Sequence, residues 1–247
     1  MRWIPGALGR TTNECVGKVR AGVETEWEVA GAGTLAQIDS AIAMIVCDWN
    51  GTLIDDRDRA CNATNRVLTG LGREPLDAPE FQAAFRLPLR AFFAALGIEA
   101  ALLDQSVRAW NLFVSEERPR LSPGVRAFLT EATRAGVSVG VVSALDEVVV
   151  RADAAALRID RSLAFVQGGV RDKAEAIRTL VDSAHAAVIY IGDTEYDIES
   201  ARSGGAIAVA FSGGYRPAPA LVLAGASAVI DSFAELIDLI VVRRLGN

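Results

Sequence analysis

Residues 41–52 of the chain read AIAMIVCDWNGT. Residues 41–47 are an uninterrupted apolar run, which is typical of a strand buried on both faces. Asp48 follows this run directly, and Asn50-Gly51-Thr52 has the composition of a turn. We therefore expect a strand that ends at Asp48 and a loop that begins there.

Short apolar runs and helical patterns alternate along the second half of the chain. Strands are expected at residues 137–142, 163–166, 187–191, 207–211 and 228–230. Helices are expected at residues 123–135, 146–157 and 172–182, in a segment that ends near residue 204, and at 233–245. This alternation predicts an α/β fold, with a doubly wound parallel sheet covered by helices on both faces.

The alternation is interrupted once, after the first strand. Residues 56–120 read as helices only, without a strand-like run. We expect a small all-helical cap domain at residues 57–120 and an α/β core formed by residues 41–56 and 121–247. Residues 1–40 show no clear period and are expected to be an extension of unclear structure.

The composition limits the possible partners and location. The chain has 247 residues with 51% hydrophobic and 23% charged residues, an ordinary globular balance. Its net charge of −6 argues against a nucleic acid or an anionic membrane as partner. The three cysteines show no metal-type spacing, and the first residues lack the apolar stretch of a signal peptide. We expect a cytoplasmic protein; the sequence does not indicate its oligomeric state.

Polar residues follow several of the expected strands. Ligands of open parallel sheets bind at the carboxyl ends of the strands, where Asp48, Ser143 and Asp193 are expected. Asp197 comes one helical turn after Asp193, so both side chains can share a face. Clustered carboxylates repel one another without a cation, and oxygen ligands suit Mg²⁺. The pattern predicts a magnesium site for phosphoryl transfer.

The order of these residues resembles the four motifs of the haloacid dehalogenase superfamily. The motifs are Asp48-Trp49-Asn50-Gly51-Thr52-Leu53, Ser143 after an apolar strand, Lys173, and Gly192-Asp193-Thr194-Glu195-Tyr196-Asp197. The resemblance extends over residues 42–235. The helical stretch resembles the cap of the phosphoglycolate phosphatase-like branch, and residues 85–90 are similar to the part of that cap near the substrate.

The resemblance implies roles for the catalytic residues. Asp48 would be the nucleophile and would form an aspartyl-phosphate that water then hydrolyses. Ser143 would donate a hydrogen bond to a phosphoryl oxygen, and Lys173 would pair with the nucleophile and the phosphate. The implied substrate is a small phosphorylated metabolite.

The resemblance also implies metal-binding and substrate-binding residues. Asp48, the backbone carbonyl of Asn50 and Asp193 would bind Mg²⁺, and Asp197 would orient or complete this shell. The candidate substrate-binding residues are Thr52, Ala144, Arg86 and Arg90.

Asn50 departs from the family pattern. Phosphatases of the family carry a second aspartate two residues after the nucleophile, and this aspartate protonates the leaving oxygen. An amide cannot act as a general acid, and loss of such an acid typically costs about 10² to 10⁴-fold in rate. Four explanations would account for Asn50. The substrate has a good leaving group, or a residue of the cap supplies the proton. Otherwise catalysis is slow, or the protein binds phosphate esters without hydrolysing them.

Other chemistries in the superfamily fit less well. Phosphonate-cleaving relatives use a lysine in the cap, and residues 57–120 contain none. Dehalogenases need no magnesium, so the presence of Asp193 and Asp197 argues against that activity. Two alternatives to a phosphatase stay open: a weak or inactive protein that binds a phosphorylated ligand, and an interaction protein that acts through residues 1–40.

Overall fold

The protein was analysed as a computed structural model that describes residues 42–238 and 240. Its six-stranded sheet has the order β3-β2-β1-β4-β5-β6, and every neighbouring pair is parallel. The strands are β1 (Ile42–Cys47), β2 (Ser138–Val142), β3 (Phe165–Gln167), β4 (Ala187–Gly192), β5 (Ile207–Phe211) and β6 (Ala228–Ile230). The expected α/β class is therefore confirmed.

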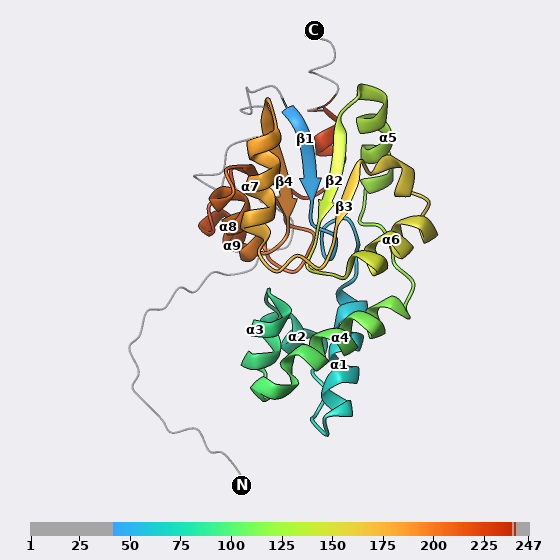
Figure 1. The fold of residues 1–247 in the computed structure, drawn as a ribbon, viewed down its shortest axis with the longest axis vertical. Helices are drawn as coiled ribbons and strands as arrows, with labels where there is room; N and C mark the ends of the chain where they lie inside the picture. Colours follow the sequence, from blue (N-terminus) through green and yellow to red (C-terminus); the bar gives the residue numbers. More distant parts are fainter. Residues whose placement is uncertain (1–41, 239, 241–247) are drawn as a thin grey trace, which may run out of the picture.

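Helices cover both faces of the sheet (Figure 1). One face carries α5 (Val125–Ala135) and α6 (Glu147–Ala156), and the other carries α7 (Lys173–Ser183), α8 (Glu195–Ser203) and α9 (Ala218–Leu223). This arrangement is the doubly wound architecture that the alternating sequence pattern predicts. None of the helices in the described part of the chain is long and apolar enough to cross a membrane.

Successive side chains of the strands enter different hydrophobic clusters. In β4, Ile189 and Ile191 pack in the cluster that contains Phe128 of α5, whereas Val188 and Tyr190 pack in the cluster that contains Ile177 of α7. A parallel strand with both faces buried needs apolar residues at every position. This requirement explains why the strands appear in the sequence as continuous apolar runs.

Several element boundaries differ from the expectation by one or two residues. The third strand begins at Phe165 instead of Leu163, because the Leu163 amide closes a turn on the carbonyl of Asp160 at 3.3 Å. The last expected helix, at 233–245, is seen at residues 235–238 and 240; residues 233–234 form a turn, and residues 239 and 241–245 lie outside the described residues. The expected extension at residues 1–40 also lies outside them.

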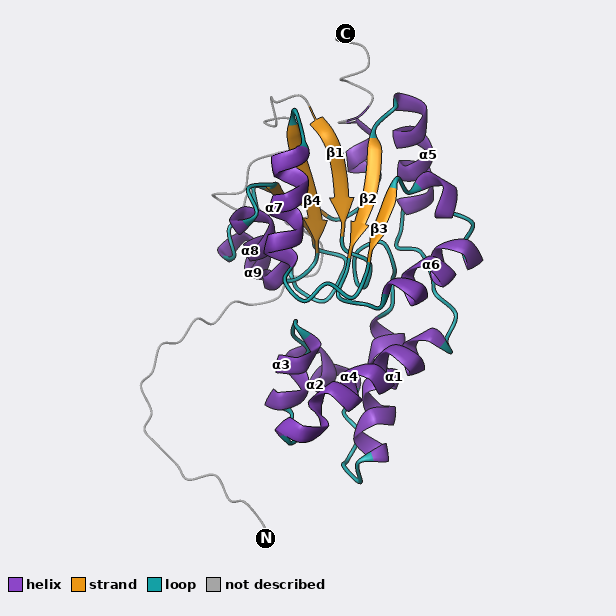
Figure 2. Ribbon diagram, viewed as in Figure 1, coloured by secondary structure: helices purple, strands orange, loops and turns teal. Residues whose placement is uncertain are grey.

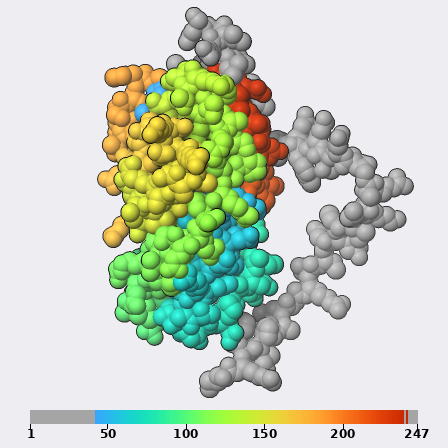
Figure 3. Space-filling model, turned by 90° about the vertical axis from the view of Figure 1, so that its right-hand side faces the viewer, coloured from blue at the N-terminus to red at the C-terminus, as the bar shows by residue number. Residues whose placement is uncertain are grey.

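A separate group of helices lies beyond the carboxyl ends of the strands (Figure 2). It comprises α1 (Arg57–Gly70), α2 (Ala78–Ala84), α3 (Leu89–Ala95) and α4 (Leu103–Ser115), with a 3₁₀ turn at Ala100–Leu102. We call residues 57–115 the helical segment. Phe92, Phe93 and Trp110 are buried inside it. Figure 3 shows this segment, coloured cyan to green, as a lobe in contact with the sheet-containing part.

A buried ion pair joins the helical segment to the core. The Arg59 guanidinium in α1 contacts both carboxylate oxygens of Asp153 in α6, at 2.7 and 3.1 Å, and its Nε donates to the carbonyl of Val114 in α4 at 2.7 Å. The indole N–H of Trp49 donates to the same carboxylate at 3.4 Å. The Asp153 carboxylate therefore connects Trp49, the residue next to Asp48, to Arg59 near the start of the helical segment. Arg59 in turn binds Val114 near the end of that segment.

Replacement of Arg59 by alanine should destabilise the fold strongly. Loss of one partner leaves a buried, unpaired charge, which typically costs about 3–5 kcal/mol. Chemical denaturation by urea measures the change in the free energy of unfolding. The matched control is Arg134→Ala, which breaks an exposed pair with Glu131 and should cost less than about 1 kcal/mol. Equal losses in the two variants would contradict the structural role of the buried pair.

Candidate active site

The loop after β1 is held tightly against the neighbouring strand. The Asp48 amide donates to the carbonyl of Ile191 at 2.8 Å, which extends the pairing of β1 with β4. The loop is closed by hydrogen bonds between Gly51 and Ile54 and between Ile54 and Trp49, each 2.9 Å long. Gly51 has a φ of +74°, and a Cβ atom there would lie 2.3 Å from Oδ2 of Asp193. Glycine is therefore required for the close approach of this loop to Asp193.

Three carboxylates meet at the carboxyl ends of the central strands. Asp48 follows β1, Asp193 follows β4, and Asp197 lies in the first turn of α8. Each offers an oxygen atom within 4.8 Å of the others, and at most 2% of each residue is exposed. The structure thus brings together the acidic residues that the sequence singled out.

Lys173 is the cation next to this cluster. The residue begins α7 and is completely buried, with Nζ 2.9 Å from Oδ2 of Asp48 and 2.6 Å from Oδ1 of Asp197. Burial alone would lower the pKa of the amine, but the carboxylates of Asp197 and Asp48 raise it. Lys173 is therefore charged at neutral pH and pairs with two of the three acids.

The remaining negative charge makes the cluster suited to a cation. Burial raises the pKa of Asp48 to about 7 despite the opposing effect of Lys173, and Asp197 raises it further. Burial, followed by the charges of Asp197 and Asp48, raises the pKa of Asp193 well above its usual range. Carboxylate oxygens are the ligands that Mg²⁺ prefers, and a divalent cation would relieve this repulsion. Asp48 and Asp193 could hold such an ion.

Asp193 and Asp197 are fixed by different neighbours. Asp193 accepts hydrogen bonds from the Thr52 hydroxyl at 2.7 Å and from the Tyr215 amide at 2.8 Å. Asp197 forms a capping box with Thr194, whose hydroxyl lies 2.5 Å from Oδ2 of Asp197. Since its other oxygen contacts Lys173, Asp197 both starts α8 and holds the lysine in place.

Ser143 and Ala144 lie beside Asp48 at the end of β2. They line a pocket of about 20 Å³ that also includes Asp48 and Asn50. The Ser143 amide donates to the carbonyl of Gln167 at 2.9 Å, and its hydroxyl oxygen accepts from the Leu145 amide at 3.2 Å. The hydroxyl hydrogen of Ser143 is thus available to an anion in the pocket.

Asn50 contacts a buried acid that the sequence did not single out. Its amide nitrogen donates to Oδ2 of Asp56, and the Gly51 amide donates to Oδ1 of the same carboxylate at 2.8 Å. The Tyr215 hydroxyl donates to it as well, at 3.2 Å. Burial raises the pKa of Asp56 to about 6, against the lowering effect of these hydrogen bonds.

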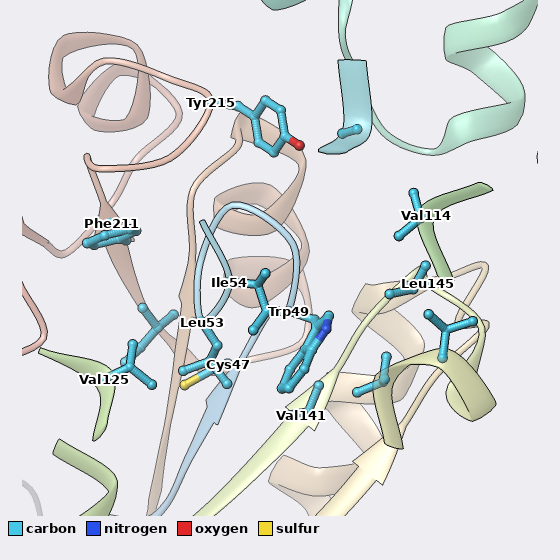
Figure 4. Packing of buried hydrophobic residues seen from close by; sticks show 14 of the residues in the cluster. Cys47, Trp49, Leu53, Ile54, Val114, Val125, Val141, Leu145, Phe211 and Tyr215 are labelled. Atoms are coloured by element: carbon cyan, nitrogen blue, oxygen red, sulfur yellow. The ribbon is translucent and has the colours of Figure 1, made fainter. Parts of the chain in front are cut away.

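The structure does not bring Arg86 and Arg90 to the pocket. Both are exposed: the Nε of Arg86 donates to the carbonyl of Ala84 at 3.1 Å, and Arg90 pairs with Asp104. Trp49 also points away from the pocket, since it is completely buried in the hydrophobic cluster that contains Val141 (Figure 4).

Sequence reasoning also missed Tyr215 and Arg216, in the loop after β5. The ring of Tyr215 stacks on Phe85 of the helical segment with centroids 4.3 Å apart. The guanidinium of Arg216 contacts Glu195 at 3.0 Å and donates to the carbonyls of Gln82 and Phe85. The sequence signal at this point is Gly213-Gly214, which predicts a turn but no contact.

Comparisons with known proteins agree with this arrangement. Residues 45–211 match the model of a family described as haloacid dehalogenase-like hydrolase. The chain is 26% identical over 203 residues to a phosphoglycolate phosphatase of Synechococcus elongatus, covering 78% of this chain and 95% of the relative. It is 28% identical over 216 residues to a phosphoglycolate phosphatase of Rhodospirillum rubrum, covering 78% and 89%.

Solved structures share the fold at lower sequence identity. A haloacid dehalogenase-like hydrolase from Streptococcus pneumoniae has a TM-score of 0.70 at 21% identity, covering 79% of this chain and 97% of its own. CbbY from Rhodobacter sphaeroides, solved in complex with xylulose 1,5-bisphosphate, has a TM-score of 0.66 at 21% identity, covering 79% and 96%.

The affinity for Mg²⁺ should rise with pH. The raised pKa values mean that Asp48 and Asp193 bind protons in the metal-free protein, and a cation must displace these protons. Below about pH 7 the competition is stronger, so titration calorimetry at pH 6, 7 and 8 should give a falling dissociation constant. Displacement of one proton changes the affinity at most about tenfold per pH unit, and displacement of both at most about a hundredfold. A constant affinity over this range would contradict the expected proton competition, and Asp193→Asn serves as the control that removes a ligand.

Proposed function

The chain belongs to the haloacid dehalogenase-like hydrolase family and is a phosphoric monoester hydrolase, and we propose that it hydrolyses a small phosphorylated metabolite through an aspartyl-phosphate on Asp48 with the help of Mg²⁺. The contact that carries this proposal is the buried pairing of Asp48 with Lys173 at 2.9 Å. It orients this carboxylate at the edge of a pocket that also contains Ser143, and it opposes the rise that burial causes in the pKa of Asp48.

The proposed first step transfers the phosphoryl group to Asp48. A carboxylate oxygen attacks phosphorus, and the bond from phosphorus to the leaving oxygen breaks. Lys173 orients the carboxylate, and the Ser143 hydroxyl donates to a phosphoryl oxygen. Asp48, Asp193 and the backbone carbonyl of Asn50 would hold Mg²⁺, which neutralises charge on the phosphoryl oxygens when bound.

In the second step, water attacks the phosphorus of the aspartyl-phosphate and releases inorganic phosphate. The helical segment acts in this proposal as a cap that closes over the pocket and limits the access of bulk water. The contacts of Tyr215 and Arg216 with this segment support that role, since they connect it to the loop next to Asp193.

The proton for the leaving oxygen is the unusual part of the proposed reaction. Asn50 has no acidic proton, and its amide nitrogen is bound to Asp56. A substrate with a good leaving group needs no such proton. Asn50 also favours a second candidate function, a weak or inactive protein that binds a phosphorylated ligand. A cytoplasmic location stays a prediction from the sequence.

Hydrolysis of p-nitrophenyl phosphate tests the chemistry, because its leaving group needs no acid. We expect phosphate release that depends on Mg²⁺ and that falls at least about 10³-fold in Asp48→Asn, which lacks the nucleophile. The matched control is Asp55→Asn, a part-exposed carboxylate in the same loop, which should retain activity. Turnover in Asp48→Asn equal to that of the parent chain would exclude the covalent mechanism.

Exchanging the amide of Asn50 with the acid of Asp56 tests whether the missing proton donor at position 50 limits the reaction. Asn50→Asp alone would place two carboxyl groups in contact, so the double variant Asn50→Asp with Asp56→Asn keeps one acid and one amide in the pair. We expect the double variant to hydrolyse alkyl phosphates about 10² to 10⁴-fold faster than the parent chain, with a smaller change for p-nitrophenyl phosphate. No gain on alkyl phosphates would show that an acid at position 50 is not what limits the reaction.

A further inference from the structure

The wall of the pocket that faces Asp48 is apolar. The helical segment contributes Phe85, Leu87, Leu89 and Trp110, and the core contributes Leu145. Phe85, Leu89 and Trp110 are each at most 4% exposed, so they pack into a continuous surface. The pocket also includes Asn50, Thr194 and Tyr215, whose donor groups contact the carboxylates of Asp56 and Asp197. The helical segment therefore offers apolar side chains to the rest of the substrate.

No lysine, arginine or histidine of the described chain lines this pocket. The nearest cation to Asp48, Lys173, is already paired with Asp48 and Asp197. Arg216 is bound to Glu195 and to backbone carbonyls of the helical segment. A negative charge on the leaving group would therefore enter the pocket without a cationic partner.

Tyr215 and Arg216 of the core hold the apolar wall in place. Tyr215 stacks on Phe85, and Arg216 donates to two carbonyls at the end of α2, where the helix dipole favours a cation. The space in the pocket is about 20 Å³, enough for one water molecule. A substrate therefore enters by displacing the wall, and a small leaving group requires the least displacement.

We propose that this pocket selects by binding for phosphate monoesters whose esterified group is small, uncharged and apolar. The inference rests on the proposed function, because it concerns the same pocket and the same phosphate position. Transfer of a carboxylate from water to an apolar wall is unfavourable unless a cation or hydrogen-bond donors replace the lost solvation. An apolar group of the same size loses nothing on transfer and gains by burial.

Two ligands of similar size test this inference directly. n-Propyl phosphate ends in a methyl group, whereas phosphoglycolate ends in a carboxylate. Affinities are measured with Mg²⁺ by calorimetry on Asp48→Asn, which does not depend on turnover, and as inhibition of p-nitrophenyl phosphate hydrolysis by the parent chain. We expect n-propyl phosphate to bind at least about tenfold more tightly by both measures.

A substitution in the apolar wall should give the pocket affinity for a negatively charged ligand. Leu87 is half-buried, so an arginine there can reach the pocket while part of its side chain stays solvated. Leu87→Arg should raise the affinity for phosphoglycolate about tenfold relative to n-propyl phosphate. The control is Leu112→Arg, at an exposed position of α4 outside the pocket, which should leave the ratio unchanged.

Three outcomes would overturn the inference. They are binding of phosphoglycolate as tight as that of n-propyl phosphate, undetectable binding of n-propyl phosphate, and a tenfold loss of phosphoglycolate affinity in Arg86→Ala or Arg90→Ala. Failure of the proposed function is a different result, namely no Mg²⁺-dependent hydrolysis of p-nitrophenyl phosphate. The calorimetric comparison still decides the inference in that case.

Discussion

The rest of the site depends on one constraint: three buried carboxylates lie close together, and one ammonium group lies between two of them. Asp48, Asp193 and Asp197 lie where water cannot screen them, and Lys173 reaches only Asp48 and Asp197. Asp193 is held instead by neutral donors, the Thr52 hydroxyl and a backbone amide. Such a cluster is stable only when its geometry is fixed from several directions, since Asp197 raises the pKa of both Asp48 and Asp193.

The strand order supplies this geometry. β1 lies between β2 and β4, so the chain after β1 has Ser143 on one side and Asp193 on the other. The connection from β1 to β2 runs through α5 on one face of the sheet, and the connection from β3 to β4 runs through α7 on the other face, which opens a space at this edge. A pocket at the end of β1 is therefore a consequence of topology, and the side chains at its edges determine its chemistry.

The sequence predicted the strands well because parallel strands buried on both faces need continuous apolar runs. It also singled out Asp48, Ser143, Asp193 and Asp197 from their places at strand ends and at the start of a helix, and the family resemblance pointed to Lys173. Asp56 and Tyr215 were missed for a physical reason. Their hydrogen bond joins residues 159 positions apart, and no local pattern reports a contact of that range.

The pocket wall shows the same difference between local and long-range information. Arg86 and Arg90 share a segment with the apolar residues of the wall, and the family resemblance of this segment suggested a substrate-binding role for them. The direction in which each side chain points depends on the packing of the segment against Tyr215. This packing turns Phe85 inward and leaves the arginines exposed.

Arg216 holds the helical segment by main-chain oxygens and not by side chains. A carbonyl oxygen is present whatever residue occupies a position, so substitutions at Gln82 leave this attachment intact. The attachment made by Arg216 is thus independent of the side chains at Gln82 and Phe85, whereas the stacking of Phe85 on Tyr215 depends on the side chain. Over evolutionary time, such a segment can diversify its lining while the protein retains a constant means of closing it.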